Sequence, residues 1–123
     1  MHELAICQAL IAQIEDIAGQ RASRVRHVCL GVGPLSGVEP RLLENAYPLV
    51  CAGTIAEGSQ IEIEETDVRV RCRVCGAEAI VAPNRLLCGT CGDWHTDLLA
   101  GDELLLLRIE FETREDAVEA SHV

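Results

Sequence analysis

The sequence predicts an α/β fold of the α+β type, in which two helices pack on a small three-stranded sheet. Two stretches carry apolar residues at helical spacing, and three others have the alternating or continuously apolar pattern of strands. A cysteine-rich stretch with neither pattern separates the second and third predicted strands. We therefore expect one α/β domain formed by residues 1–68 and 101–112, an inserted module at 69–100, and a flexible tail at 113–123.

The first half of the chain contains both predicted helices. Residues 4–18 form the first, because their apolar side chains share one face and Gly19 follows as a stop signal. This face consists of Cys7, Leu10, Ile11, Ile14, Ile17 and Ala18. A strand is expected at 24–32, where valine and leucine side chains alternate. The second helix should span 40–51 and start on a proline, with a kink or an irregular turn at Pro48.

The second half contains the other two predicted strands. At 60–65 isoleucines alternate with polar residues, and 101–112 contains the strand-like run LLLLRIEFE. The glutamates of these strands are expected on solvated faces; they are Glu62, Glu64, Glu110 and Glu112. The acidic residues after this run show no pattern, so we expect them to fray.

The composition excludes several classes of function. All ten basic residues are arginine, and without lysine the chain cannot form a P-loop, a Schiff base or a pyridoxal anchor. The formal charge of -10 argues against nucleic acid and against an anionic membrane surface as main partners. Seven cysteines without a signal peptide or a long apolar run indicate a reducing compartment, so we expect a cytoplasmic protein.

Two CxxC motifs separated by twelve residues predict a metal site. Each motif can present two thiolates from one tight turn, and two such turns complete the tetrahedral sulfur shell of structural Zn2+. The four ligands would be Cys72, Cys75, Cys88 and Cys91. Four sulfur ligands leave no open position for catalysis, so we expect this zinc to hold a small zinc-ribbon-like module together.

The chain opens with Met-His-Glu, which offers a second possible metal site. The α-amine, a backbone amide and the His2 imidazole can chelate one divalent ion in a plane, and nitrogen-rich planar sites suit Ni2+ or Cu2+. On spacing alone, a solvated histidine at the terminus is the commoner explanation, because so short a motif also arises by chance.

Several longer segments occur in order along the chain: MHEL, GPLSGVEPRLLENAYPLVCAGTIAEGSQIEIEE, CRVCG, CGTCG and AGDELLLLRIEFE. Together they resemble the HypA/HybF family of nickel metallochaperones, which serve the maturation of nickel-iron hydrogenases. The resemblance covers residues 1–112. It implies nickel bound by His2 and neighbouring N-terminal nitrogens with Glu3 close by, and zinc on the four cysteines. Trp94, His95 and the tail depart from the family pattern, which leaves the partner surface open.

These observations predict a nickel carrier rather than an enzyme, which accepts Ni2+ and releases it into a hydrogenase large-subunit precursor. The resemblance implies the GTPase accessory protein HypB as a partner, and we expect a monomer or a weak homodimer. The alternative is a zinc-ribbon protein–protein adaptor without a nickel site of its own. A zinc-dependent hydrolase is disfavoured because the strong metal site is saturated with sulfur.

The remaining reactive side chains have simpler explanations. His27 and Cys29 share one strand face and could form a catalytic dyad, but no third orienting group is apparent, so a covered sheet face is favoured. His95 is expected at the surface or beside the zinc ligands, with a transient nickel contact as the less favoured alternative. Cys7 and Cys51 are expected to pack in the core.

Overall fold

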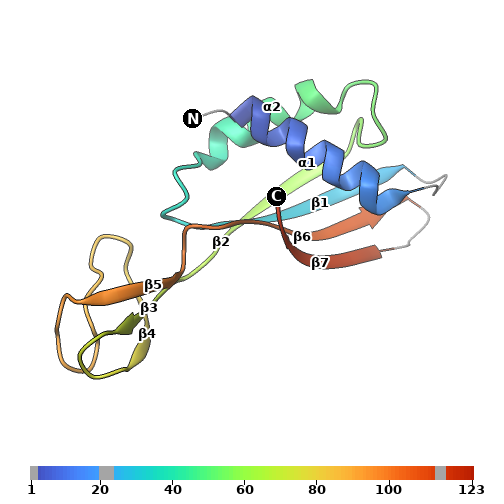
Figure 1. Ribbon diagram of the computed structural model, residues 1–123. Helices are drawn as coiled ribbons and strands as arrows, with labels where there is room; N and C mark the ends of the chain where they lie inside the picture. The colour runs from blue at the N-terminus through green and yellow to red at the C-terminus, as the bar shows by residue number, and fades with distance from the viewer. Residues whose placement is uncertain (1–2, 20–23, 113–115) are drawn as a thin grey trace.

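The fold comes from a computed structural model, which describes residues 3–19, 24–112 and 116–123, with the backbone alone for 116–120. It contains two helices and two separate sheets (Figure 1). In chain order the elements are α1 (Glu3–Ala18), β1 (Val25–Val32), α2 (Pro40–Cys51), β2 (Gln60–Glu65), β3 (Val68–Cys72), β4 (Glu78–Val81), β5 (Thr96–Ala100), β6 (Leu104–Phe111) and β7 (Asp116–His122).

The main sheet has the strand order β2–β1–β6–β7. Strands β1 and β2 are parallel, because α2 carries the chain back across the sheet between them, whereas β6 is antiparallel to both of its neighbours. Both helices lie on the same face of this sheet (Figure 1), so its opposite face is covered by no described helix. The predicted class, two helices on a sheet with a separate cysteine-bearing module, is confirmed.

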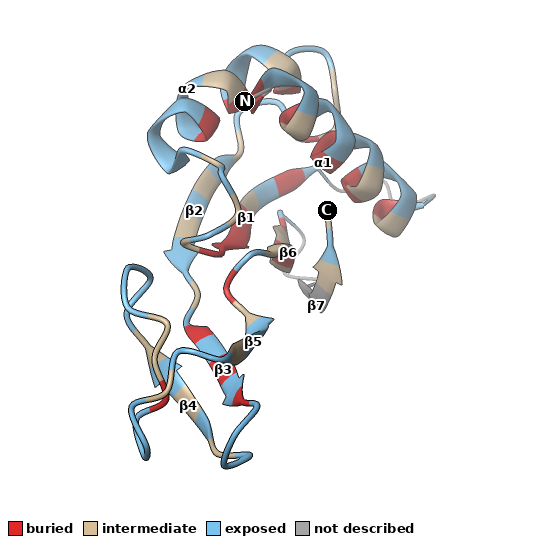
Figure 2. Ribbon diagram, turned by 60° about the vertical axis from the view of Figure 1, so that its left-hand side comes forward, coloured by how far each residue is buried: buried red, intermediate tan, exposed pale blue. Residues whose placement is uncertain are grey.

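The core lies between the helices and this sheet. Side chains of the predicted α1 face, among them Leu10 and Ile14, are fully buried, and they pack with alternate residues of β1 such as Val28. Figure 2 shows these buried positions along α1 and β1. Tyr47 and Phe111 are the largest fully buried side chains, so two of the few aromatic rings join an otherwise aliphatic core.

The frayed tail and the three-stranded sheet expected from the sequence are wrong. Strand β7 extends the main sheet to four described strands by pairing with β6, from Glu110 beside Asp116 to Leu105 beside His122. The Gln13 side-chain amide of α1 donates to the Ser121 hydroxyl at 2.7 Å. The open edge of β6 offers backbone hydrogen bonds to any extended segment, and these bonds need no apolar pattern in that segment.

Two element boundaries also differ from expectation. Helix α2 continues to Cys51 without a break at Pro48, where the sequence predicts a kink or an irregular turn. Strand β6 begins at Leu104 rather than at residue 101. Gly101 has a φ of 127°, outside the strand region, and its carbonyl accepts a hydrogen bond from the Leu35 amide instead.

The smaller sheet, of order β4–β3–β5, forms the module that carries the CxxC motifs. The chain enters this module after β2 and returns to the main sheet before β6, and hydrogen bonds hold the entering and returning segments together. The Glu103 carboxylate accepts hydrogen bonds from the Thr66 hydroxyl at 2.9 Å and from the Gly101 amide at 2.8 Å. The Gly33 amide donates to the Glu103 carbonyl at 2.8 Å, and a Cβ on Gly33 would lie only 2.3 Å from the Gly101 oxygen.

Candidate metal centres

The two CxxC motifs form matching turns at the end of the smaller sheet. Strand β3 ends at Cys72, and the Gly76 amide then donates to the Cys72 carbonyl at 3.0 Å. The second turn repeats this bond, from the Gly92 amide to the Cys88 carbonyl at 2.9 Å. Gly76 and Gly92 have φ angles of 77° and 76°, which side chains disfavour, so a glycine closes each turn.

The four-cysteine cluster, defined as Cys72, Cys75, Cys88 and Cys91, has the dimensions of a tetrahedral metal site. All four sulfur atoms lie within 4.8 Å of one another. The Sγ–Sγ distance is 3.7 Å between Cys72 and Cys91 and 3.5 Å between Cys75 and Cys88. Bonds of about 2.3 Å from zinc to sulfur place tetrahedral sulfur atoms about 3.8 Å apart, so the cluster fits such an ion.

Backbone amides stabilise thiolates in this cluster. Cys72 Sγ accepts hydrogen bonds from the amides of Cys75 at 3.4 Å and Val74 at 3.3 Å. In the second turn, the amides of Cys91 and Thr90 donate to Cys88 Sγ in the same way and hold the Cys88 pKa at about 6. In the same cluster, hydrogen bonds with neighbouring thiols and burial outweigh the backbone amides near Cys75 and Cys91 and raise the pKa of these two thiols. The backbone amides therefore favour the thiolate, the form that binds metal, at one cysteine of each motif.

His95 lies beside the cluster but is engaged elsewhere. Its Nδ1 is 2.6 Å from Asp93 Oδ1, which also accepts the His95 amide, and its ring stacks on Trp94 with centroids 3.7 Å apart. Asp93 in turn accepts the Cys88 amide through its carbonyl at 2.9 Å. His95 is therefore a surface residue near the cluster, as one of the two sequence interpretations has it.

At the N-terminus, His2 lies outside the described residues, and Glu3 is the first residue of α1. Glu3 is 9% exposed, and its Oε2 has no hydrogen-bond partner in the part of the chain that the structure describes. One helical turn further, Cys7 is buried, and burial together with Cys51 and Glu3 raises the Cys7 pKa to about 11. The sequence does not predict that this carboxylate is turned inward, because a charged residue at a helix start is usually solvated.

Other polar groups near Cys7 and Cys51 are buried or half-buried. The hydroxyls of Tyr47 and Ser59 share a hydrogen bond of 2.7 Å, and Ser59 also donates to the Ala56 carbonyl at 2.6 Å. Burial raises the pKa of Tyr47 and of Cys51, so both stay protonated at neutral pH. Cys7 and Cys51 are core residues, as the sequence predicts.

His27 and Cys29 lie on the face of the main sheet that no described helix covers (Figure 1), whereas the sequence favoured a covered sheet face over a catalytic dyad. His27 Nδ1 lies 3.0 Å from Glu110 Oε2, and Arg26 and Arg108 also pair with this carboxylate, at 2.8 and 3.1 Å. Glu110 is therefore held in ion pairs, and the prediction that it is merely solvated is wrong. Burial raises its pKa, but the two arginines and His27 outweigh this effect, and the Glu110 pKa lies below its ordinary value.

On the same face, Cys29 lies toward β2, next to Glu62 and Glu64, whereas Glu110 belongs to β6. The thiol sulfur and one oxygen of each carboxylate are all within 4.8 Å of one another. Both glutamates are exposed, as the sequence predicts, whereas Cys29 is buried. Burial, followed by the nearby carboxylates, raises the Cys29 pKa to about 11. The sequence did not predict this cluster, because its three residues meet only through the register between β1 and β2, and a crossover through α2 sets that register.

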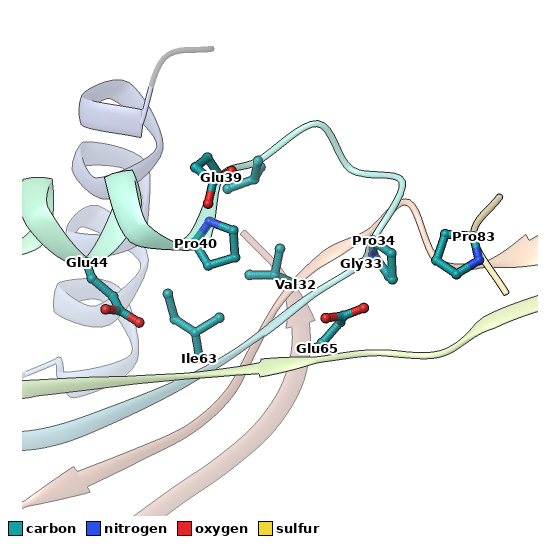
Figure 3. A pocket seen from close by; sticks show the side chains of 10 residues that line it. Val32, Gly33, Pro34, Glu39, Pro40, Glu44, Ile63, Glu65 and Pro83 are labelled. Carbon is teal, nitrogen blue, oxygen red and sulfur yellow. The ribbon is translucent and has the colours of Figure 1, made fainter.

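One surface pocket lies at the start of α2, away from the four cysteines (Figure 3). It has a volume of about 520 Å³, and Glu39, Pro40, Ile63, Glu65 and Pro83 are among its lining residues. No helix among the described residues is both long and apolar enough to cross a membrane.

Comparison with known proteins adds a family to this geometry. A family profile described as "Hydrogenase/urease nickel incorporation, metallochaperone, hypA" matches residues 1–111. The chain is 48% identical over 114 residues to the hydrogenase maturation factor HypA of Nitrosospira multiformis, which covers 92% of this chain and 99% of that protein. The factor of the same name from Streptomyces avermitilis is 41% identical over 115 residues, covering 91% and 88%.

A solved structure with the same fold supports the arrangement of the elements. The solution structure of the Ni metallochaperone HypA from Helicobacter pylori matches with a TM-score of 0.69 at 23% identity, covering 90% of this chain and 97% of that one. At this identity the likeness concerns the fold alone.

Proposed function

Because the chain belongs to the HypA family of metallochaperones for nickel incorporation into hydrogenase and urease, we propose that it carries Ni2+ to the precursor of a nickel-iron hydrogenase large subunit. Proteins of this family are maturation factors and not catalysts. The nickel ligands in this proposal are His2 and the neighbouring N-terminal nitrogens, with the Glu3 carboxylate beside them.

The observation that carries the nickel site is the buried Glu3 carboxylate. A carboxylate in this position without a hydrogen-bond partner for one oxygen is costly, and a cation bound beside it offsets that cost. The α-amine and the imidazole of His2 precede Glu3 directly in the sequence, within reach of the same ion.

For the four-cysteine cluster we propose Zn2+ with a structural role. Its sulfur distances suit a tetrahedral shell, and four thiolates leave no position open for a substrate or water. The module around it buries few large side chains, since Val74, Ile80 and Trp94 are exposed, so metal binding would supply much of its folding free energy.

The partners in this proposal follow from the family. They are HypB, the GTPase accessory protein, and the large-subunit precursor, and the exchange would take place in the cytoplasm. The exposed apolar side chains of the module, above all Trp94 at 69% exposure, favour a protein contact there. This observation also supports the second candidate, an adaptor that docks through the module and has no nickel site of its own.

Isothermal titration with Ni2+ distinguishes the two candidates. We expect His2→Ala to weaken nickel binding by at least about tenfold, and one residue added before Met1 to weaken it nearly as much, because the amine moves out of the chelate. The matched control is His122→Ala, which removes an exposed histidine at the other end of the chain. Normal binding in the extended protein would exclude the amine as a ligand, and normal binding in both variants would place the nickel site elsewhere. An unmodified protein that binds no nickel would favour the adaptor.

A further inference from the structure

We propose that Cys29, Glu62 and Glu64 form a second divalent-metal site on the helix-free face of the main sheet, suited to an ion of the zinc and cobalt type. We call these three residues the thiol–carboxylate cluster. The site is distinct from the N-terminus and from the four-cysteine cluster, and it goes beyond the proposed nickel function.

The register of the two parallel strands places the three donors together. Cys29 of β1 lies beside Glu62 of β2, and Gly31 lies beside Glu64. Val28 and Leu30 point into the core under the helices, so Cys29 between them points to the opposite face. Gly31 has no side chain, and Thr66 Cγ2 lies 3.0 Å from the position that its Cβ would take.

The distances suit a metal shell after small side-chain movements. The sulfur and the two oxygen atoms lie within 4.8 Å of one another. Donors around a tetrahedral ion lie about 3.3–3.8 Å apart, given bonds of about 2.0–2.2 Å to oxygen and 2.3 Å to sulfur. Both glutamates are exposed on an edge strand, so they can close this difference by rotating, while the buried Cys29 stays in place.

The buried thiol is an independent reason to expect a cation here. Cys29 is 5% exposed, and its polar neighbour within hydrogen-bonding reach is Glu62, a member of the same cluster. Here the thiol points at two carboxylates, which repel its anion unless a cation lies between them.

The charges around the cluster are also unbalanced. Among the residues that the structure describes, neither Glu62 nor Glu64 takes part in an ion pair within 4.0 Å. Arg108 of β6 pairs beside Cys29 and interacts with it electrostatically, but its guanidinium is hydrogen-bonded to Glu110 at 3.1 Å. A bound divalent ion would supply the positive charge that the protein does not place there.

The donor set selects the class of ion. A thiolate disfavours Mg2+ and Ca2+, which take oxygen ligands, and two carboxylates disfavour the soft ions held by sulfur alone. Zn2+ and Co2+ accept both donor types. Three protein donors leave a fourth position for water, so this site would exchange its ion more readily than the four-cysteine cluster.

The test is a titration of the full chain with Co2+, whose bond to a thiolate gives an intense near-ultraviolet absorption. The protein is loaded with zinc and carries His2→Ala, so that the proposed nickel site contributes nothing. We expect one further cobalt ion to bind with this absorption. Cys29→Ala should abolish the absorption, and the double variant Glu62→Gln, Glu64→Gln should weaken binding by at least about tenfold.

Glu65→Gln is the matched control, because it makes the same charge change on the same strand from a residue that pairs beside Val32. It should leave cobalt binding unchanged. The exposed glutamine substitutions do not threaten the fold, and circular dichroism checks Cys29→Ala. Zinc analysis after the titration shows that the four-cysteine cluster keeps its ion, and absorption that then persists in Cys29→Ala would overturn the proposal. An absence of further cobalt binding, or equal weakening in Glu65→Gln, would do so as well.

Discussion

Truncation of Ile14 to alanine measures how much the packing of α1 contributes to the stability of the main sheet. Ile14 is 0% exposed and belongs to the core formed by both helices and the sheet. The change removes three carbon atoms, worth about 2.4 kcal/mol at about 0.8 kcal/mol each. The cavity left behind brings the expected loss in the free energy of unfolding to about 3–4 kcal/mol, within the range of about 2–5 for such truncations.

The assay is urea unfolding followed by circular dichroism of the helices. Leu4→Ala is the control, because Leu4 lies on the same helix and is 50% exposed, so its loss should stay below about 1 kcal/mol. Equal slopes of the unfolding free energy against urea would show that both variants unfold the same structure. If Ile14→Ala costs no more than Leu4→Ala, the face of α1 that we place against the sheet is wrong.

Three further predictions concern metal and pH. The double variant Cys88→Ala, Cys91→Ala should lose zinc, which metal analysis measures. The fluorescence of the single tryptophan should change, while the circular dichroism of the helices persists. Full zinc retention would contradict the assignment of these ligands. Burial raises the pKa of Glu103, but hydrogen bonds from Gly101 and Thr66 outweigh it, so its folded-state pKa is lowered. Its stabilising contribution should be present above the unfolded pKa of about 4.3 and disappear as the pH falls through the lower folded value, and Glu103→Gln should flatten this part of the curve of stability against pH. Nickel affinity should fall as the pH drops from about 8 to about 6, because nickel displaces protons from the amine and the imidazole; titrations that show constant affinity across this window would exclude these ligands.

Local patterns predicted what depends on local geometry. The helical spacing through Leu10 and Ile14 predicted the buried face of α1, and the alternation at 60–65 predicted β2 with the bounds that the structure has. The CxxC spacing predicted the four-cysteine cluster, because each turn is complete within a few residues.

Features that depend on pairing between distant segments were not predictable. Strand β7 lacks an apolar alternation, and its place is decided by the open edge of β6. The approach of His27 to Glu110 and of Glu62 to Cys29 depends on strand register, which no single segment encodes.

The junction at Glu103 makes the cysteine module a side branch of the main sheet. The chain leaves the main sheet at Thr66 and returns to it at Gly101, and the Glu103 carboxylate binds both residues. The ends of the module are therefore held close together by the main domain itself, without a contribution from the module. Replacing residues 69–100 by a turn of a few residues shortens this connection about eightfold. The entropic cost of closing the loop then falls by about 2 kcal/mol, since each doubling of length costs about 0.6 kcal/mol. A branch joined in this way can be lengthened, shortened or exchanged during evolution while the α/β part keeps its fold.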